Sequence, residues 1–136
     1  MKKLSHLLML LIALISFTAS AQNKNNLLQG TWQFNGGTYN GKTDTASLQY
    51  TMRRVYTSSN FNAFACQKGY KTERYEAGKY RIKRDTCFET QTYSSRPSQA
   101  IGKTIAYTFK ISKKELILSG KLPSGMLVEE HWKKIK

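Results

Sequence analysis

Apolar and polar residues alternate along most of this chain, with short polar interruptions between the alternating runs. The clearest run is Ile101–Ile111, where Ile105, Tyr107, Phe109 and Ile111 share one parity and Thr104, Ala106, Thr108 and Lys110 the other. This period of two residues is typical of a β-strand with one buried face. Similar runs predict eight strands in all, over Leu28–Phe34, Ser47–Thr57, Phe61–Cys66, Gly78–Arg84, Thr86–Tyr93, Ile101–Ile111, Glu115–Lys121 and Met126–Ile135.

The segments between these runs carry turn signals. Asn35-Gly36-Gly37, Thr57–Asn60, Asp85 and Pro123–Gly125 are short and predict tight turns, whereas Gln67–Ala77 and Ser94–Ala100 predict longer loops. No window after the first 21 residues has a sustained helical period. Eight successive strands joined mostly by hairpins predict an all-β, antiparallel up-and-down barrel, because closure removes both sheet edges. An open two-sheet sandwich is the alternative.

The first 21 residues have a different pattern, typical of a secretory signal peptide. Lys2 and Lys3 precede an apolar run from Leu7 to Phe17, and Ala19-Ser20-Ala21 offers small residues for cleavage. The run is too short for a transmembrane helix, which needs about 20 residues. We expect residues 1–21 to be removed and residues 22–136 to form one domain in the periplasm or outside the cell, without a membrane span.

The net charge narrows the range of partners. The full chain has 22 basic and 8 acidic side chains, and loss of Lys2 and Lys3 leaves a formal charge of +12. Such a charge attracts polyanions, and outside the cytoplasm these are anionic envelope components rather than nucleic acid. The basic residues are spread along the chain, which also suits strand faces that are simply solvated.

Short motifs at both ends support the barrel and suggest a family. Gly30-Thr31-Trp32 opens the first strand, and Glu130-His131-Trp132-Lys133 lies in the last one. A G-x-W at this place resembles the opening motif of the lipocalins and their calycin relatives, and the C-terminal segment looks like compact lipocalin-like families of exported bacterial proteins. In that superfamily the tryptophan plugs one end of the barrel. The resemblance therefore implies a lipocalin-like fold and little chemistry.

Catalytic and metal sites find little support in the sequence. After the signal segment there is one histidine, His131, and its triad partners would have to be Asp44 or Asp85, both placed in loops. A carboxylate pair could come from Glu89, Glu129 and Glu130, but Glu129 and Glu130 are adjacent, so only one of them faces the interior. An interior carboxylate is more easily the partner of an arginine than a catalyst. We expect no enzyme activity, no cofactor and no metal.

The two cysteines, Cys66 and Cys87, leave two alternatives open. An oxidising compartment favours a disulfide bond between them. A strict meander opposes it, because the strand between them would separate the sulfurs by about 20 Å, beyond disulfide reach. The state of this pair therefore tests the topology.

An eight-stranded barrel holds either packed side chains or one small ligand. An empty apolar void of about 300 Å³ would cost about 7 kcal/mol, so the interior must be packed or polar enough to hold water. We therefore expect a carrier or sensor of a small hydrophobic or amphipathic molecule. The alternative is a fully packed barrel whose basic surface binds envelope polyanions or a protein. Which parity of residues 86–93 faces inward is undecided, and the candidate ligand-binding residues are Tyr50, Arg53, Tyr80, Ile82, Glu89, Gln91, Tyr107, Phe109 and Trp132.

Overall fold

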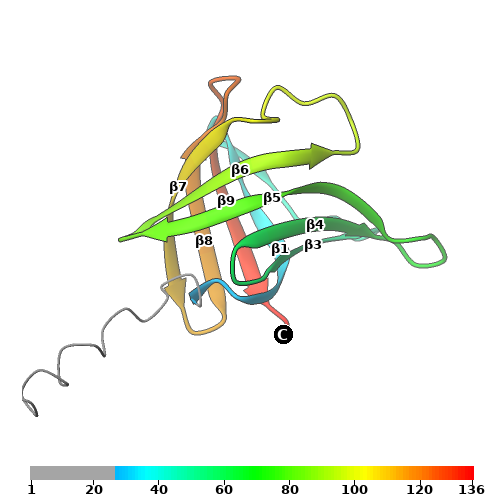
Figure 1. Ribbon diagram of the computed structural model, residues 1–136. Coiled ribbons are helices and arrows are strands. Elements are labelled where there is room, and N and C mark those ends of the chain that lie inside the picture. Colours follow the sequence, from blue (N-terminus) through cyan, green and yellow to red (C-terminus); the bar gives the residue numbers. More distant parts are fainter. Residues whose placement is uncertain (1–26) are drawn as a thin grey trace, which may run out of the picture.

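The computed structural model describes residues 27–136 and shows a closed antiparallel β-barrel (Figure 1). No α-helix occurs within these residues. Neighbouring strands pair in chain order from β3 to β9, while β1 pairs with both β3 and β9 and so closes the ring. The strands are β1 (Gly30–Tyr39), β2 (Lys42–Asp44), β3 (Thr51–Tyr56), β4 (Asn60–Cys66), β5 (Glu73–Lys83), β6 (Thr86–Ser94), β7 (Thr104–Ser112), β8 (Glu115–Lys121) and β9 (Leu127–Lys134).

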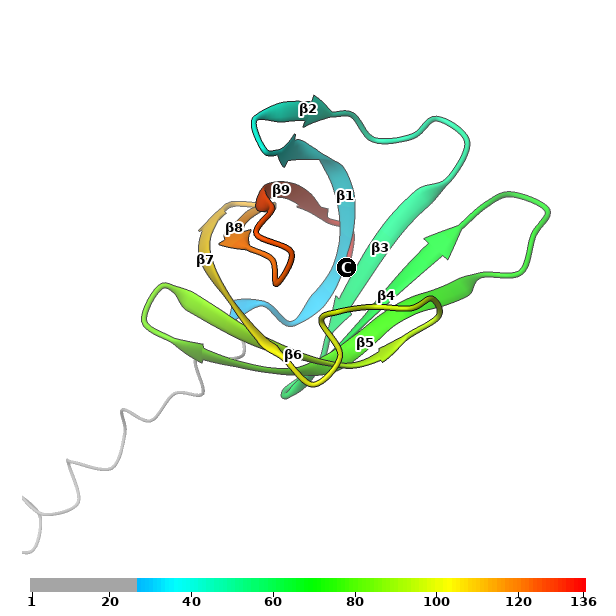
Figure 2. The same cartoon turned by 90° about the horizontal axis from the view of Figure 1, so that it is seen from above.

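The prediction of an eight-stranded closed barrel is confirmed, and the two-sheet alternative is wrong. Eight strands form the wall, and the short β2 pairs only with the outer part of β1. Figure 2 shows the ring from above, with β2 lying outside it. The predicted signal peptide, its cleavage after Ala21 and the start of the domain at residue 22 lie outside the described residues. No described helix has the length and apolar character needed to cross a membrane.

Two of the predicted turns and loops are wrong. The chain does not turn at residues 35–37, because β1 continues to Tyr39 through a β-bulge between Phe34 and Gly37. Gly37 is needed there, since a Cβ atom would lie 2.2 Å from the carbonyl oxygen of Glu129 on β9. The predicted loop of residues 67–77 is shorter, because β5 begins at Glu73. The sequence pattern did not indicate the start of this strand, because its first two residues, Glu73 and Arg74, are both charged and both exposed.

One end of the barrel is closed by the first residues of the fold. Leu28 and Trp32 are fully buried, and the Trp32 indole donates a hydrogen bond of 2.7 Å to the Leu28 carbonyl. The Lys134 ammonium lies 5.3 Å from the centre of the Trp32 ring. This arrangement is the plug that the G-x-W motif implies. The connections at this end, residues 57–59, 84–85 and 113–114, are short.

The other end of the barrel carries the longer connections. Because the strands alternate in direction, residues 45–50, 67–72, 95–103 and 122–126 all lie at the end opposite Trp32. The packed core occupies the closed end and the middle, where apolar residues from every wall strand converge. We call the end with the longer connections the open end, since a pocket enters the barrel there.

Candidate functional site

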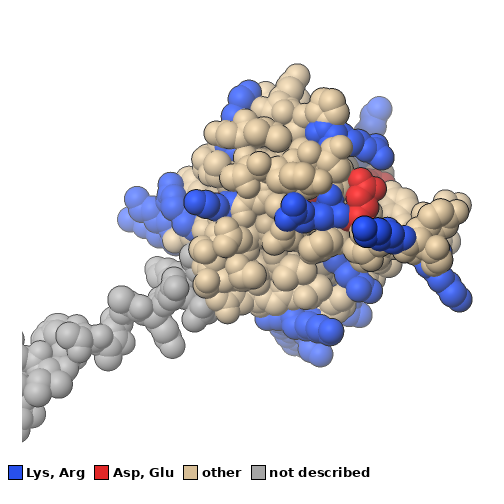
Figure 3. Space-filling view, turned by 45° about the vertical axis from the view of Figure 1, so that its right-hand side comes forward, with Lys and Arg blue, Asp and Glu red and all other residues tan. Residues whose placement is uncertain are grey.

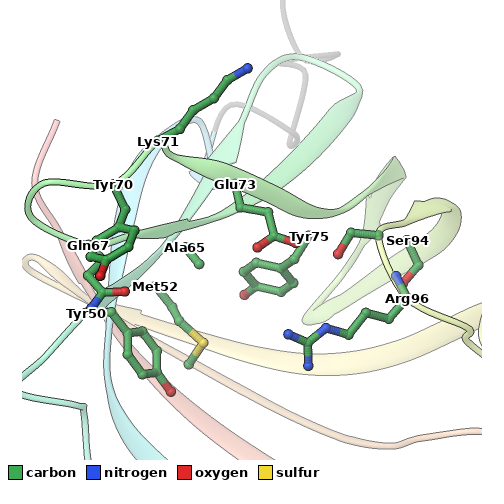
Figure 4. A pocket seen from close by; sticks show the side chains of 11 residues that line it. Tyr50, Met52, Ala65, Gln67, Tyr70, Lys71, Glu73, Tyr75, Ser94 and Arg96 are labelled. Carbon is green, nitrogen blue, oxygen red and sulfur yellow. The ribbon is translucent and has the colours of Figure 1, made fainter.

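A pocket of about 590 Å³ lies at the open end between β3, β4, β5 and the end of β6 (Figure 4). Its size is within the usual range for small-molecule sites, roughly 300–1,000 Å³. Three tyrosines and a methionine give it an amphipathic wall, and Arg96 reaches in from the segment after β6. The lining residues are Tyr50, Met52, Ala65, Gln67, Tyr70, Lys71, Glu73, Tyr75, Ser94, Ser95 and Arg96.

A β-bulge aims Tyr75 into this pocket. In the pairing of β4 with β5, Ala63 faces Glu76 and Phe64 faces Arg74, so Tyr75 is the extra residue. Strict alternation from the inward-facing Tyr80 would place Tyr75 on the outer face, and the bulge reverses this. Burial raises the pKa of the Tyr75 hydroxyl to about 12. The hydroxyl is therefore protonated at neutral pH and available as a hydrogen-bond donor.

A buried cluster of charged and polar side chains lies deeper in the barrel. Met52 lines the pocket, and Arg54 follows it on the same face of β3 toward the closed end. The Arg54 Nη1 atom lies 3.3 and 3.2 Å from the two carboxylate oxygens of Glu89, and its Nη2 atom lies 3.3 Å from Glu76. The Tyr56 hydroxyl donates a hydrogen bond to Glu89 as well. Arginine, two carboxylates and a phenol thus form one network.

Aromatic rings enclose the Arg54 guanidinium. Its central carbon lies 5.1 Å from the Phe61 ring centre and 5.4 Å from that of Trp132. Glu130, which accepts hydrogen bonds from the Tyr39 hydroxyl and the Trp132 indole, extends the network toward β1 and β9. The cation is thereby compensated by carboxylates and by ring faces, which a buried charge requires.

Burial dominates the protonation of this cluster. Loss of solvent raises the pKa of the Glu89 carboxyl, against the opposing effects of the Arg54 charge and the Tyr56 hydrogen bond. The negative charge of Glu89 in turn holds the pKa of Arg54 well above its usual range, despite the burial of the guanidinium. Arg54 therefore keeps its positive charge at neutral pH.

The structure places the nine predicted ligand-binding residues in different environments. Tyr50 lines the pocket, where 43% of its surface is exposed. Tyr80, Tyr107 and Trp132 are buried in the core, Glu89 is buried in the charged cluster, and Ile82 and Phe109 are partly buried. Gln91 is buried outside both groups and accepts a hydrogen bond from the Ser98 hydroxyl. The sequence left open which side chains of residues 86–93 face inward. In the structure these are Cys87, Glu89 and Gln91. Their role in ligand binding stays a prediction.

The inward arginine was predicted one residue away from its true position. Arg54 is buried, and Arg53 lies on the opposite face of β3, half-buried, so the placement of Arg53 in the lumen is wrong. The parity of this strand is set by Met52 and Tyr56, which pack inward with Arg54 between them. The interpretation that an interior carboxylate would pair with an arginine applies to Glu89 and Arg54.

Sequence reasoning missed most of the pocket wall. Tyr70, Lys71, Glu73 and Tyr75 lie in the segment that was predicted to be a polar loop. A signal was present in Arg74-Tyr75-Glu76-Ala77, where charged and less polar residues alternate, although out of phase with Tyr80 and Ile82 of the strand that follows. The bulge at Tyr75, however, depends on the register of two strands, and no local pattern specifies it.

The candidate catalytic residues are dispersed. His131 is exposed, with its Nε2 atom 2.8 Å from Glu129, while Asp44 lies on β2 and Asp85 in the turn between β5 and β6. Glu129 is exposed and Glu130 partly buried, as expected for neighbours on a strand. Among residues 27–136 no three histidine, cysteine or acidic side chains are grouped as a metal site would require. Both cysteines are free, and Cys87 is buried beside Glu89.

A barrel with one end plugged by a tryptophan and a pocket at the other end belongs to the lipocalin-like class of folds. No protein-family model matches the chain, and no curated protein matches it. The fold is similar to the crystal structure of an uncharacterised protein from Bacteroides eggerthii, with a TM-score of 0.58 and 16% sequence identity. The match covers 79% of this chain and 98% of that chain. At this identity the similarity shows the fold alone.

Proposed function

We propose that the protein is an exported binding protein that holds one small amphipathic molecule in the open end of its barrel. The observation that carries this proposal is the pocket of about 590 Å³, whose wall combines Met52 with the aromatic rings of Tyr50, Tyr70 and Tyr75. Apolar walls with a few polar groups at defined places are typical of small-molecule sites.

The polar groups of the pocket favour an amphipathic ligand over a purely apolar one. Tyr75 offers a protonated hydroxyl, and Arg96 and Gln67 offer further donors to a polar group of the ligand. The apolar part of such a ligand would lie against Met52 and Ala65, above the buried Arg54. We propose binding without catalysis, because the deeper carboxylates Glu76 and Glu89 are already engaged by Arg54.

Uptake of a lipophilic fluorescent dye such as N-phenyl-1-naphthylamine tests the proposal. We expect saturable binding of one dye molecule per chain, and loss of that binding in Ala65→Trp, which fills the pocket. The matched control is Ala106→Trp, because Ala106 is exposed on the outer face of β7. Absence of dye binding by the wild-type protein, or equal binding by both variants, would contradict the proposal. Native mass spectrometry of the protein from its own host would reveal a bound natural ligand.

The proposed export has its own test. Expression of the full chain in a bacterium, followed by osmotic release of the periplasm, should yield a protein whose intact mass begins at Gln22. A product that stays with the membrane and retains Met1 would contradict export with cleavage after Ala21. The proposed relationship to the lipocalin-like families of exported bacterial proteins rests on the G-x-W motif and its role in closing the barrel.

A further inference from the structure

Two loops beside the mouth of the pocket expose large apolar side chains. Leu48 is fully exposed in the segment before β3, and Tyr70 is 72% exposed in the loop between β4 and β5. The two loops lie side by side, because Leu48 and Tyr50 share the wall of a second, shallow depression with Gln67 and Lys68. We call Leu48, Tyr50, Lys68, Tyr70 and Lys71 the lip.

The exposure of the lip has no explanation in the stability of the barrel. A single exposed leucine is ordinary on a protein surface, but here an exposed leucine and two tyrosines lie on adjoining loops. Tyr50 lines both depressions, one with Leu48 and the other with Tyr70, so the three side chains form an apolar edge beside the pocket. Tyrosine has an apolar ring and a polar hydroxyl, and this combination is favoured where an apolar layer meets water. Such an edge is therefore suited to an interface between water and hydrocarbon.

The charges of the lip complement an anionic surface. Lys68 and Lys71 are exposed beside the apolar edge, and Arg96 lies across the pocket mouth. The pocket wall contains the acidic side chain of Glu73 and the cationic side chains of Lys71 and Arg96, so positive charge predominates there. Elsewhere, Figure 3 shows lysine and arginine side chains scattered over the visible face, and the chain as a whole carries a formal charge of +14. Long-range attraction to a negative surface would therefore orient no particular face, and the apolar edge selects the lip.

We propose that the lip docks the protein on an anionic phospholipid surface, with Leu48 and Tyr70 inserted at the level of the headgroups and Lys68 and Lys71 on the phosphates. Apolar side chains flanked by lysines bind anionic bilayers through burial of apolar area together with electrostatic attraction. Docking through this face places the mouth of the pocket against the bilayer. A ligand of the proposed function could then enter from the lipid without crossing water, although docking itself does not require that function.

The test is flotation of the purified residues 22–136 with vesicles of phosphatidylcholine alone or with added phosphatidylglycerol. We expect binding to the vesicles that contain phosphatidylglycerol and a steep loss of binding at high salt. Lys68→Glu should lower the apparent affinity about tenfold, and Leu48→Ser should lower it at every salt concentration. Neither residue lines the main pocket, so dye uptake should be unchanged in both variants.

Matched controls come from the opposite end of the barrel. Ile111→Ser removes an exposed apolar side chain near the closed end, and Lys113→Glu reverses an exposed charge there. Both controls should float like the wild-type protein. Equal losses in the lip variants and the controls would overturn the proposal, because binding would then not depend on the lip. Absence of flotation with anionic vesicles would overturn it as well, whatever the dye experiment shows. Ala65→Trp should lose dye and keep vesicle binding, which separates the two functions.

Discussion

Arg54 on β3 and Glu89 on β6 meet inside the barrel, although two strands separate β3 from β6 in the wall. Both side chains are at most 5% exposed, and the distance from Nη1 to Oε2 is 3.2 Å. Their contact therefore spans the lumen instead of following the sheet. This ion pair connects β3 with β6 directly beneath the pocket.

Removal of either member of this pair should destabilise the fold strongly. Arg54→Leu leaves Glu89 buried without its cation, and a broken buried pair costs about 3–5 kcal/mol in the free energy of unfolding. The double variant Arg54→Leu, Glu89→Leu should be more stable than the single variant, because no buried charge remains at Glu89. Urea unfolding followed by tryptophan fluorescence measures the stability of the wild-type protein, the single variant and the double variant. The exposed Glu129→Gln serves as control and should change little.

The seam between the first and last strands should be intolerant of a side chain at Gly37. A Cβ atom there would lie 2.2 Å from the Glu129 carbonyl oxygen, so Gly37→Ala forces β1 and β9 apart. We expect a loss of about 1–3 kcal/mol, in the range of overpacked sites. The neighbouring Thr38→Ala, on the same seam and without such a contact, is the control. A thermal midpoint of Gly37→Ala equal to that of the control would show that the strands are not closed here.

Stability should fall at alkaline pH. Burial raises the pKa of Tyr75 and Tyr80 to about 12, and it raises the pKa of Tyr39, Tyr56 and Tyr107 as well. An unfolded tyrosine has a pKa of about 10, so above that pH the unfolded chain has lost protons that the folded chain retains. The free energy of unfolding therefore decreases between about pH 10 and 12. Urea midpoints across this range, with phenolate absorbance, measure the effect, and Tyr75→Phe should reduce its slope.

The two thiols should differ in reactivity. Cys87 is fully buried, and burial together with the charge of Glu89 raises the pKa of its thiol, whereas Cys66 is half-buried at the end of β4. The thiolate is the nucleophile that attacks a thiol reagent, so the native protein should react at Cys66, and Cys87 should react only after unfolding. Cys66→Ser should abolish the native reaction. A protein in which neither thiol reacts until a reductant is added would instead contain the disulfide.

Much of the barrel could be predicted, because local sequence patterns indicate its strands and turns. The alternation of Ile105, Tyr107 and Phe109 specified which face of β7 is buried, and Asp85 marked a hairpin that the structure confirms. The Gly30-Thr31-Trp32 motif indicated the end at which the barrel is plugged. In each case a few neighbouring residues contain the whole signal, since pleat and turn chemistry are properties of short segments.

The candidate site was harder to predict because it depends on register between strands. Arg54 and Arg53 are adjacent residues of the same type, and only the packing of Met52 and Tyr56 decides which of them is buried. Tyr75 faces the pocket because of a bulge that exists only in the pairing of β4 with β5. The wall of the pocket combines segments around residues 50, 70 and 95. These segments lie close together only because the strands that carry them pair in the folded barrel.

The pairing of β1 with β9 also affects the order of events during synthesis. Trp32 and Lys134 become neighbours across about a hundred residues of chain, so the ring stays incomplete until the last strand has emerged. Until then the nascent meander presents two bare edges that can recruit strands from other molecules. A chain cut short before Leu127 would keep them permanently, and would be expected to aggregate rather than to yield a smaller folded domain.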